Sequence, residues 1–198
     1  MNTLKAEKRD MSIKAKKLRR EGFVTGNLFG RELEDSIPLK FDKGEIEKLL
    51  KVENKGGQVM LEVAGETYDA LIKEVDYNPL KGYIDEIDFQ ALVSNEKVHS
   101  VAEIVLVNHD KLEAGVLQQH LEEISFRALP SALVDKIMVD VGDMKVGDVI
   151  KVKDLAIAQD KDVDLKTDLE AAVVSVAAVH VDPVLEAEEE AAAEEEAK

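Results

Sequence analysis

Short segments in which apolar and polar residues alternate recur along this chain, and a period of two is the spacing of a β-strand with one buried face. The pattern is clearest in residues 58–75, where two alternating runs flank the short connection 64–66. This arrangement predicts a β-hairpin. Apolar residues have helical spacing over 43–52, and 12–21 fits either a short helix or an ordered loop. The expected fold class is therefore mainly β with short helices (α+β).

Further strand candidates alternate in the same way or are rich in β-branched residues. They are 37–41, 83–92, 98–108, 115–122, 124–128, 134–141, 146–152 and 171–181. The charged stretch 94–97 divides these segments best, so we expect a strand-rich first domain over residues 1–93 and a mostly β second domain over 94–182. Residues 186–198 are almost wholly Glu and Ala with no apolar stripe, and we expect residues 183–198 to form a disordered acidic tail.

Positive charge is concentrated at the amino-terminal end of an otherwise acidic protein. The formal net charge is -16, yet residues 1–31 contain nine Lys or Arg against three acids and carry +6. Residues 32–181 carry -15 and residues 182–198 carry -7. Association responds to the local potential over roughly 8 to 10 Å at physiological salt. Residues 1–31, which we call the basic arm, are therefore a candidate nucleic-acid contact.

The basic arm contains six cations suited to phosphate contact. They are Arg9, Lys14, Lys16, Lys17, Arg19 and Arg20. An arginine can hold a phosphate through two parallel hydrogen bonds, and Phe23 or Phe29 would be available near a base or a sugar. A solvated cationic surface is the alternative interpretation, because charge runs are common on protein surfaces.

A second group of polar residues lies in and near the expected strand 83–92. Its members are the carboxylates Asp76, Asp85, Glu86 and Asp88. Alternation places Ile84, Glu86 and Asp88 on one face of that strand. No nucleophile accompanies the acids, so solvent-facing strand residues are favoured over acid–base catalysis. If this face meets RNA, a carboxylate could accept a hydrogen bond from a base amino group.

Several other kinds of site are disfavoured by the sequence. The chain has no cysteine, and its four histidines lack the spacing of metal ligands. Gly22, Gly26 and Gly30 form neither a phosphate-binding loop nor a dinucleotide fingerprint, and we interpret them as turn residues. The start lacks the apolar region of a secretory signal, and no apolar run approaches a membrane span. We therefore expect a cytoplasmic protein with no cofactor, no metal and no membrane partner.

Several segments occur in the order found in a known family. They are Arg9, 14–22, 28–30, 78–79, 84–89, 115–117, 129–130, 139–141 and 146–148. Together they extend over nearly the whole chain to about residue 182. The series resembles the bacterial large-subunit ribosomal proteins that bind 5S rRNA (bL25, also called general stress protein CTC), in their long two-domain form. Asp88 and Phe89 match the family pattern. Residues 25–26, Phe29, Asn78 and Glu86 depart from it, the last two replacing histidines.

The resemblance implies an amino-terminal β-barrel that grips 5S rRNA, a mostly β second domain and a structural role without catalysis. The predicted RNA contacts are Arg9, Lys14, Lys16, Lys17, Arg19, Arg20, Phe29 and Asp88, together with Lys73 and Lys81, cations that Asp88 could orient. The implied partners are 5S rRNA and the large ribosomal subunit, with 23S rRNA and neighbouring ribosomal proteins as possible further contacts, and no small-molecule substrate. Two alternatives stay open: a stress-related RNA-binding protein of the same fold acting partly off the ribosome, and an enzyme, which the lack of a catalytic constellation disfavours.

Overall fold

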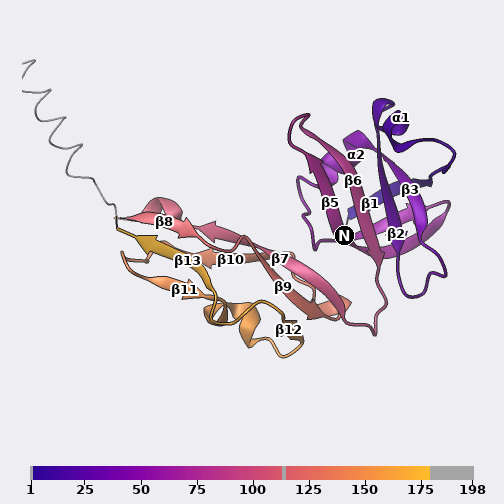
Figure 1. The fold of residues 1–198 in the computed structure, drawn as a ribbon. Helices are drawn as coiled ribbons and strands as arrows, with labels where there is room; N and C mark the ends of the chain where they lie inside the picture. The colour runs from indigo at the N-terminus through magenta and orange to yellow at the C-terminus, as the bar shows by residue number, and fades with distance from the viewer. Residues whose placement is uncertain (1, 113–114, 179–198) are drawn as a thin grey trace, which may run out of the picture.

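The computed structural model describes residues 2–112 and 115–178, and its first half is a closed β-barrel (Figure 1). The barrel order is β1-β3-β2-β6-β5-β4. These strands are β1 (Asn2–Lys8), β2 (Phe23–Phe29), β3 (Ile37–Asp42), β4 (Gln58–Val63), β5 (Glu66–Asn78) and β6 (Tyr83–Ala91). The β4–β5 pair confirms the predicted hairpin. Strand β1 was missed, because only Leu4 and Ala6 point inward among charged neighbours.

Parallel pairing of β1 with β4 and of β2 with β6 closes the barrel, and the remaining neighbours are antiparallel. Alternate residues of each strand fill the interior, where the rings of Phe41 and Phe89 lie 5.3 Å apart. Each fully buried side chain of this size contributes about 1.5 to 3 kcal/mol to stability. The barrel therefore has a core of its own.

Gly26 lies inside β2, so its interpretation as a turn residue was wrong. A Cβ atom at this position would stand 1.8 Å from the backbone oxygen of Ile87 on β6. The glycine thus allows β2 and β6 to approach closely. Gly22 does lie in a turn, with φ of +91° directly after the first helix.

Two short helices flank the barrel. Helix α1 (Ala15–Arg20) settles the choice between helix and loop over 12–21, and it buries Leu18. Helix α2 (Lys43–Leu49) begins after Asp42, whose carboxylate accepts hydrogen bonds from the backbone of Gly44 and Glu45. Its apolar face buries Ile46 and Leu49 against the barrel.

Two β-bulges interrupt the β5–β6 pair. The register passes from Ile72↔Phe89 to Glu74↔Asp88, which leaves Lys73 as the extra residue of β5. It then passes from Asp76↔Glu86 to Tyr77↔Ile84, which leaves Asp85 as the extra residue of β6. A bulge changes the direction in which a strand's side chains point. The second bulge turns Ile84 into the core while Glu86 and Asp88 stay outside, so the prediction that the three share one face was wrong.

The second half of the chain consists of two small sheets packed on one another. The four-stranded sheet has the order β10-β7-β9-β12, and the three-stranded sheet the order β11-β13-β8. These strands are β7 (Val98–Val107), β8 (Val116–Gln119), β9 (Glu123–Ala128), β10 (Lys136–Asp140), β11 (Val149–Lys151), β12 (Val163–Leu165) and β13 (Ala172–Ala177). Four 3-10 helices connect them: η1 (His109–Lys111), η2 (Pro130–Ala132), η3 (Val152–Asp154) and η4 (Ala156–Gln159). The predicted mostly β second half is confirmed.

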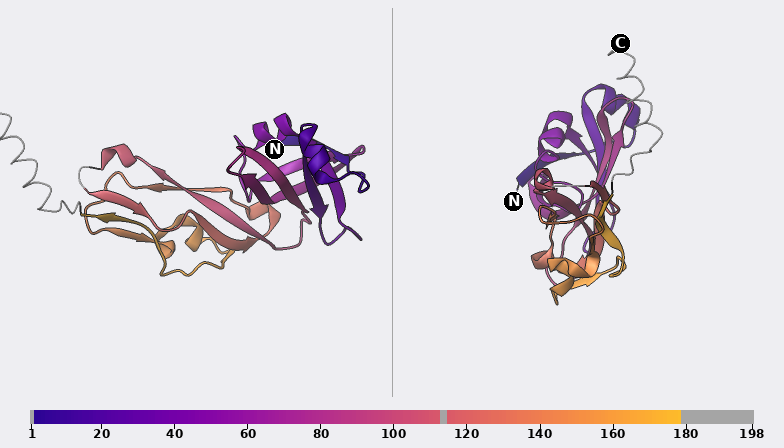
Figure 2. Two further views of the ribbon diagram at one scale, coloured as in Figure 1. Left: turned by 45° about the horizontal axis from the view of Figure 1, so that its top comes forward. Right: turned by 90° about the vertical axis from the view of Figure 1, so that its left-hand side faces the viewer.

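The barrel and the second sheet pair lie end to end (Figure 2). The last barrel strand ends at Ala91 and β7 begins at Val98, so the predicted boundary near 94–97 falls in the connection between them. The predicted acidic tail, 183–198, lies outside the described residues. No helix in the described part of the chain is long and apolar enough to cross a membrane.

Candidate nucleic-acid interface

Helix α1 is held to the barrel by Arg19 and the bulge at Asp85. The Nε group of Arg19 donates a hydrogen bond of 2.9 Å to the backbone oxygen of Asp85. The Arg19 guanidinium also lies 3.4 Å from the Asp85 carboxylate and 3.8 Å from the Glu86 carboxylate. Because Arg19 is only 27% exposed and is already paired with acids, it positions α1.

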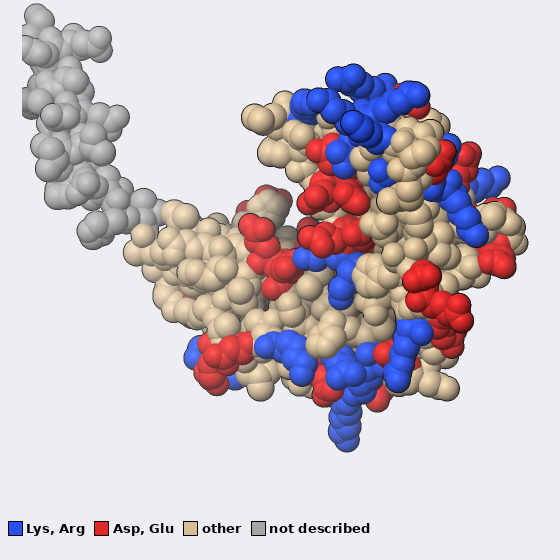
Figure 3. Space-filling view, turned by 45° about the vertical axis from the view of Figure 1, so that its right-hand side comes forward, with Lys and Arg blue, Asp and Glu red and all other residues tan. Residues whose placement is uncertain are grey.

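A pocket of about 490 Å³ opens between α1 and the β5–β6 turn. It is lined by Lys16, Arg19, Arg20, Phe23, Lys43, Asn78, Lys81, Tyr83, Ile84 and Asp85, and we call it the basic pocket. Figure 3 shows Lys and Arg side chains gathered at this end of the barrel. Five cations thus face one concave surface, and Asp85, the one acid in its lining, is engaged by Arg19.

Tyr83 is the aromatic centre of the basic pocket. The ammonium of Lys43 lies 5.3 Å from the centroid of its ring, and that of Lys81 lies 5.7 Å away. The Lys81 ammonium also donates a 3.3 Å hydrogen bond to the Tyr83 hydroxyl. A ring flanked by cations can stack on a base while the cations contact its phosphates.

The other cations of the basic arm do not all lie near this pocket: Lys14 and Lys17 adjoin or belong to α1, whereas Arg31, at the other end of the arm, lies 3.4 Å from Glu96. Lys14 and Lys17 are exposed, and Lys17 lies 3.8 Å from Glu21 on the same helix. Arg9 is half-buried, and one of its terminal nitrogens donates to the backbone oxygen of Ile13, two residues before α1. Among the described residues the buried Nε of Arg9 has no hydrogen-bond partner. Such a group is costly unless something satisfies it.

An acidic ledge lies beside the basic pocket on the outer face of β5 and β6. It consists of the cross-strand pairs Glu74–Asp88 and Asp76–Glu86. Burial and the neighbouring Asp88 raise the pKa of the Glu86 carboxyl, against the opposite pull of Arg19. Asp88 accepts hydrogen bonds from the backbone and the side-chain amide of Asn27, at 2.9 and 3.1 Å, both on Oδ1. Figure 3 shows this red band below the blue end of the barrel.

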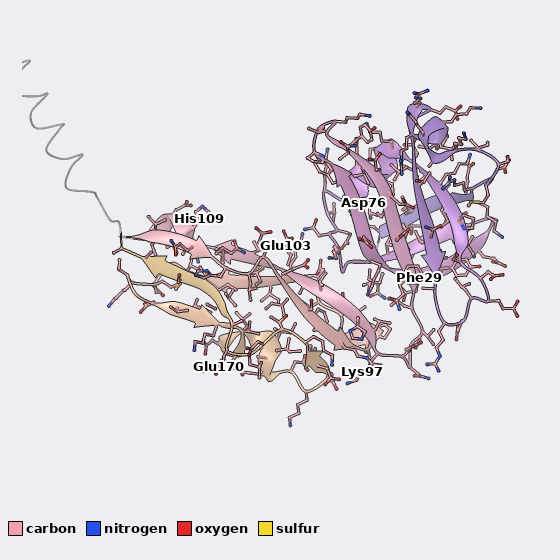
Figure 4. All side chains as sticks on the ribbon, in the orientation of Figure 1. Phe29, Asp76, Lys97, Glu103, His109 and Glu170 are labelled. Carbon is pink, nitrogen blue, oxygen red and sulfur yellow. The ribbon has the colours of Figure 1, made fainter. Side chains whose placement is uncertain are left out.

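The structure brings together only part of the predicted contact set. Lys16, Arg19, Arg20 and Lys81 line the basic pocket. Lys17 lies on α1, Lys14 directly precedes it, and Arg9 contacts Ile13 just before the helix. Asp88 lies on the acidic ledge. Phe29 lies at the far end of β2 from Phe23, roughly 20 Å away along a strand, and Figure 4 shows it at the opposite end of the barrel from α1. Lys73 faces the second domain.

Sequence reasoning overlooked Lys43 and Tyr83. Lys43 directly follows β3, and the antiparallel pairing of β3 with β2 places it beside Gly22 at the end of α1. Tyr83 begins the strand that pairs with the end of β5. Both belong to segments whose elements were predicted, but their proximity depends on barrel closure, which local spacing does not encode.

A barrel that carries a concave cationic surface with aromatic rings is typical of a nucleic-acid-binding protein. Residues 4–89 match the Ribosomal L25p family, and residues 97–180 match the C-terminal domain of ribosomal protein TL5. A large ribosomal subunit protein bL25 from Thermoanaerobacter sp. (strain X514) is 31% identical over 179 residues, covering 89% of this chain and 88% of that protein.

Two further relatives carry the same name. The protein of Geobacillus thermodenitrificans is 34% identical over 142 residues, covering 71% of this chain and 67% of its own length. The protein of Finegoldia magna is 29% identical over 195 residues, covering 96% and 92%. The chain therefore belongs to the ribosomal L25p family, in a form that also carries the TL5-type second domain. It is a structural, non-catalytic component of the ribosome.

Proposed function

We propose that this protein binds 5S rRNA within the large ribosomal subunit, in the bacterial cytoplasm, through the basic pocket and the exposed side of α1. The observation that carries the proposal is the convergence of Lys16, Arg20, Lys43 and Lys81 on one pocket, in which Lys43 and Lys81 lie next to the Tyr83 ring. These cations come from three parts of the chain. If the cations of α1 were only a solvated surface, there would be no reason for cations of α2 and of the β5–β6 turn to line the same pocket.

The side chains around the pocket have different roles in this proposal. The exposed cations Lys14, Lys16, Lys17 and Arg20 contact phosphates from α1. Arg19 keeps the helix in place through Asp85, so its effect on RNA is indirect. Asp88 has its Oδ1 occupied by Asn27, which leaves Oδ2 to accept a hydrogen bond from a base amino group or a 2′-hydroxyl.

The proposed RNA-binding unit is the barrel, residues 1–93. Its core is self-contained, and every cation of the basic pocket comes from it. Residues 94–182 then form a second domain attached through 92–97. Unpaired or widened regions of RNA expose bases and 2′-hydroxyl groups. In this proposal the ammonium groups of the pocket contact the phosphates of such a region, and the ring stacks on one of its bases.

The experiment is a titration of the full chain with a 5S rRNA transcript at several salt concentrations. Each phosphate neutralised adds about -0.7 to -0.9 to the slope of log K against log salt. We expect Arg20→Glu to weaken binding at least tenfold and to make the slope shallower. The matched control is Lys145→Glu, the same change of charge at an exposed site in the second domain. Equal affinities of the two variants would refute the assignment of the basic pocket.

A further inference from the structure

Lys73 points away from the basic pocket because it is the extra residue of a β-bulge. Its ammonium donates a 2.8 Å hydrogen bond to the backbone oxygen of His99 on β7, across the boundary between the two domains. An ammonium has three donors, so this bond uses one of them. The bulge therefore orients the Lys73 side chain towards the junction of the domains, where its ammonium group has two further hydrogen-bond donors.

A cleft of about 350 Å³ surrounds this lysine. Its lining includes Lys55, Lys73, His99, Ser100, Ser125 and Lys166, and we call it the interdomain cleft. Lys55 and Lys73 come from the barrel, and the others come from the second domain. The cleft thus combines three ammonium groups with two hydroxyl donors.

Three lysines of the cleft face one carboxylate in its lining, that of Glu74, which also belongs to the acidic ledge. Lys55 lies 3.5 Å from Glu123, but within the described residues neither Lys73 nor Lys166 forms an ion pair. Burial, followed by repulsion from Lys55, lowers the pKa of the Lys73 ammonium. Like charges are gathered here although residues 32–181 carry -15 overall. The binding of an anion that neutralises these lysine ammonium groups would therefore be favourable.

Close packing keeps the cleft in shape. Gly56 has φ of +89°, and a Cβ atom there would stand 2.0 Å from the backbone oxygen of Val101 on β7. Lys136 of β10 donates a 3.2 Å hydrogen bond to the backbone oxygen of Val52, and Asn54 donates to the Glu103 carboxylate. These contacts hold the domains together beside the cleft, so its donors have fixed positions.

We propose that the interdomain cleft binds a phosphate group of an RNA backbone, as a second contact beside that of the basic pocket. The inference rests on the proposed RNA binding of the barrel. Lys73 and Asn78 are five residues apart on β5, about 17 Å along a strand, with the acidic ledge between them. The carboxylates of the acidic ledge repel phosphate. An RNA bound on this face would therefore place its phosphates at the two ends of the ledge, and its base amino groups and 2′-hydroxyl groups over the carboxylates.

Figure 3 shows the corresponding alternation of charge, with blue at the top of the barrel, red below it and blue again towards the second domain. A phosphate in the cleft would bridge lysines of both domains. RNA binding would then fix the orientation of the second domain as well as that of the barrel.

The test compares full-length Lys166→Glu with Lys145→Glu in the 5S rRNA titration. Lys166 lines the cleft, whereas Lys145 lies beyond the far end of β10, and both are exposed or half-exposed cations whose replacement changes the net charge equally. We expect Lys166→Glu to weaken binding three- to tenfold more than the control and to make the salt slope shallower by about one unit. Lys166→Gln should give a smaller loss in the same direction.

The outcomes separate the two proposals. If the wild-type protein does not bind 5S rRNA, the proposed function fails, and this inference fails with it. If the wild type binds but Lys166→Glu equals Lys145→Glu, the cleft does not contact RNA. A titration with inorganic phosphate, followed through the amide resonances of Ser125 and Lys166, gives a second measurement. Phosphate-induced shifts together with unchanged RNA affinity in Lys166→Glu would make the cleft a small-anion site and overturn the RNA contact.

Discussion

The Nε atom of Arg19 lies 2.9 Å from the backbone oxygen of Asp85, and this contact joins α1 to the barrel. The bulge at Asp85 supports it, because the extra residue turns its oxygen outward at the end of β6. Thr25 also approaches the same oxygen, at 3.4 Å. Arg19, a predicted phosphate contact, thus also has a structural role, because it anchors the helix that carries the other cations of α1.

Replacing Arg19 with Lys should therefore reduce RNA affinity even though the charge is kept. A lysine cannot donate from Nε to Asp85 while also approaching the two carboxylates. We expect a loss of about 1 kcal/mol in unfolding free energy by urea titration, since the pair is partly exposed. Hydrogen exchange of the amides of residues 15–20 should accelerate. Unchanged exchange and unchanged affinity would show that α1 does not need this anchor.

Replacing Gly26 with Ala should destabilise the barrel by about 3 kcal/mol, measured by chemical unfolding. The new methyl group would meet the backbone of Ile87, which cannot move without separating β2 from β6. Gly22→Ala is the control: φ there is +91°, but nothing lies within 4 Å of the added carbon. That change should cost only about 1 kcal/mol. Equal losses in the two variants would contradict the close approach of the strands.

Glu86 gives the stability a pH dependence of defined sign. Its pKa is raised in the folded protein by burial and by Asp88, so folding favours the protonated form. The ionised carboxylate therefore costs stability at neutral pH, and this cost disappears as the pH falls through the raised folded value towards 4.5, the ordinary value. Glu86→Gln should be more stable than the wild type at pH 7, and the difference should shrink near pH 4. A difference that is constant with pH would contradict this account.

Most of the strands were predictable because each needed only a local alternation of apolar residues, whereas β1 and the short strand β12 were missed. The hairpin of β4 and β5 and the last strand of the barrel are examples. The bulges were not predictable, since an extra residue such as Lys73 or Asp85 is visible only when the partner strand is known. The basic arm could be identified from its charge. The distance between Phe29 and the basic pocket and the position of Lys43 next to Tyr83 could not, because both follow from the closure of the barrel.

Tyr83 provides the sharpest test of the basic pocket, because its ring lines the pocket and the ammonium groups of Lys43 and Lys81 lie 5.3 and 5.7 Å from its centroid. Tyr83→Ala should weaken 5S rRNA binding by about 1 to 3 kcal/mol, the range for loss of one stacked base. Tyr83→Phe keeps the ring and loses only the hydroxyl that accepts from Lys81, so most of the affinity should remain.

The control for Tyr83 is Tyr77→Ala. Tyr77 is 60% exposed on the same β5–β6 hairpin but does not line the pocket. This variant removes the same side chain from the hairpin without touching the proposed contact, so its affinity should match the wild type. If Tyr77→Ala and Tyr83→Ala weaken binding equally, the RNA lies across the hairpin tip and no base enters the basic pocket.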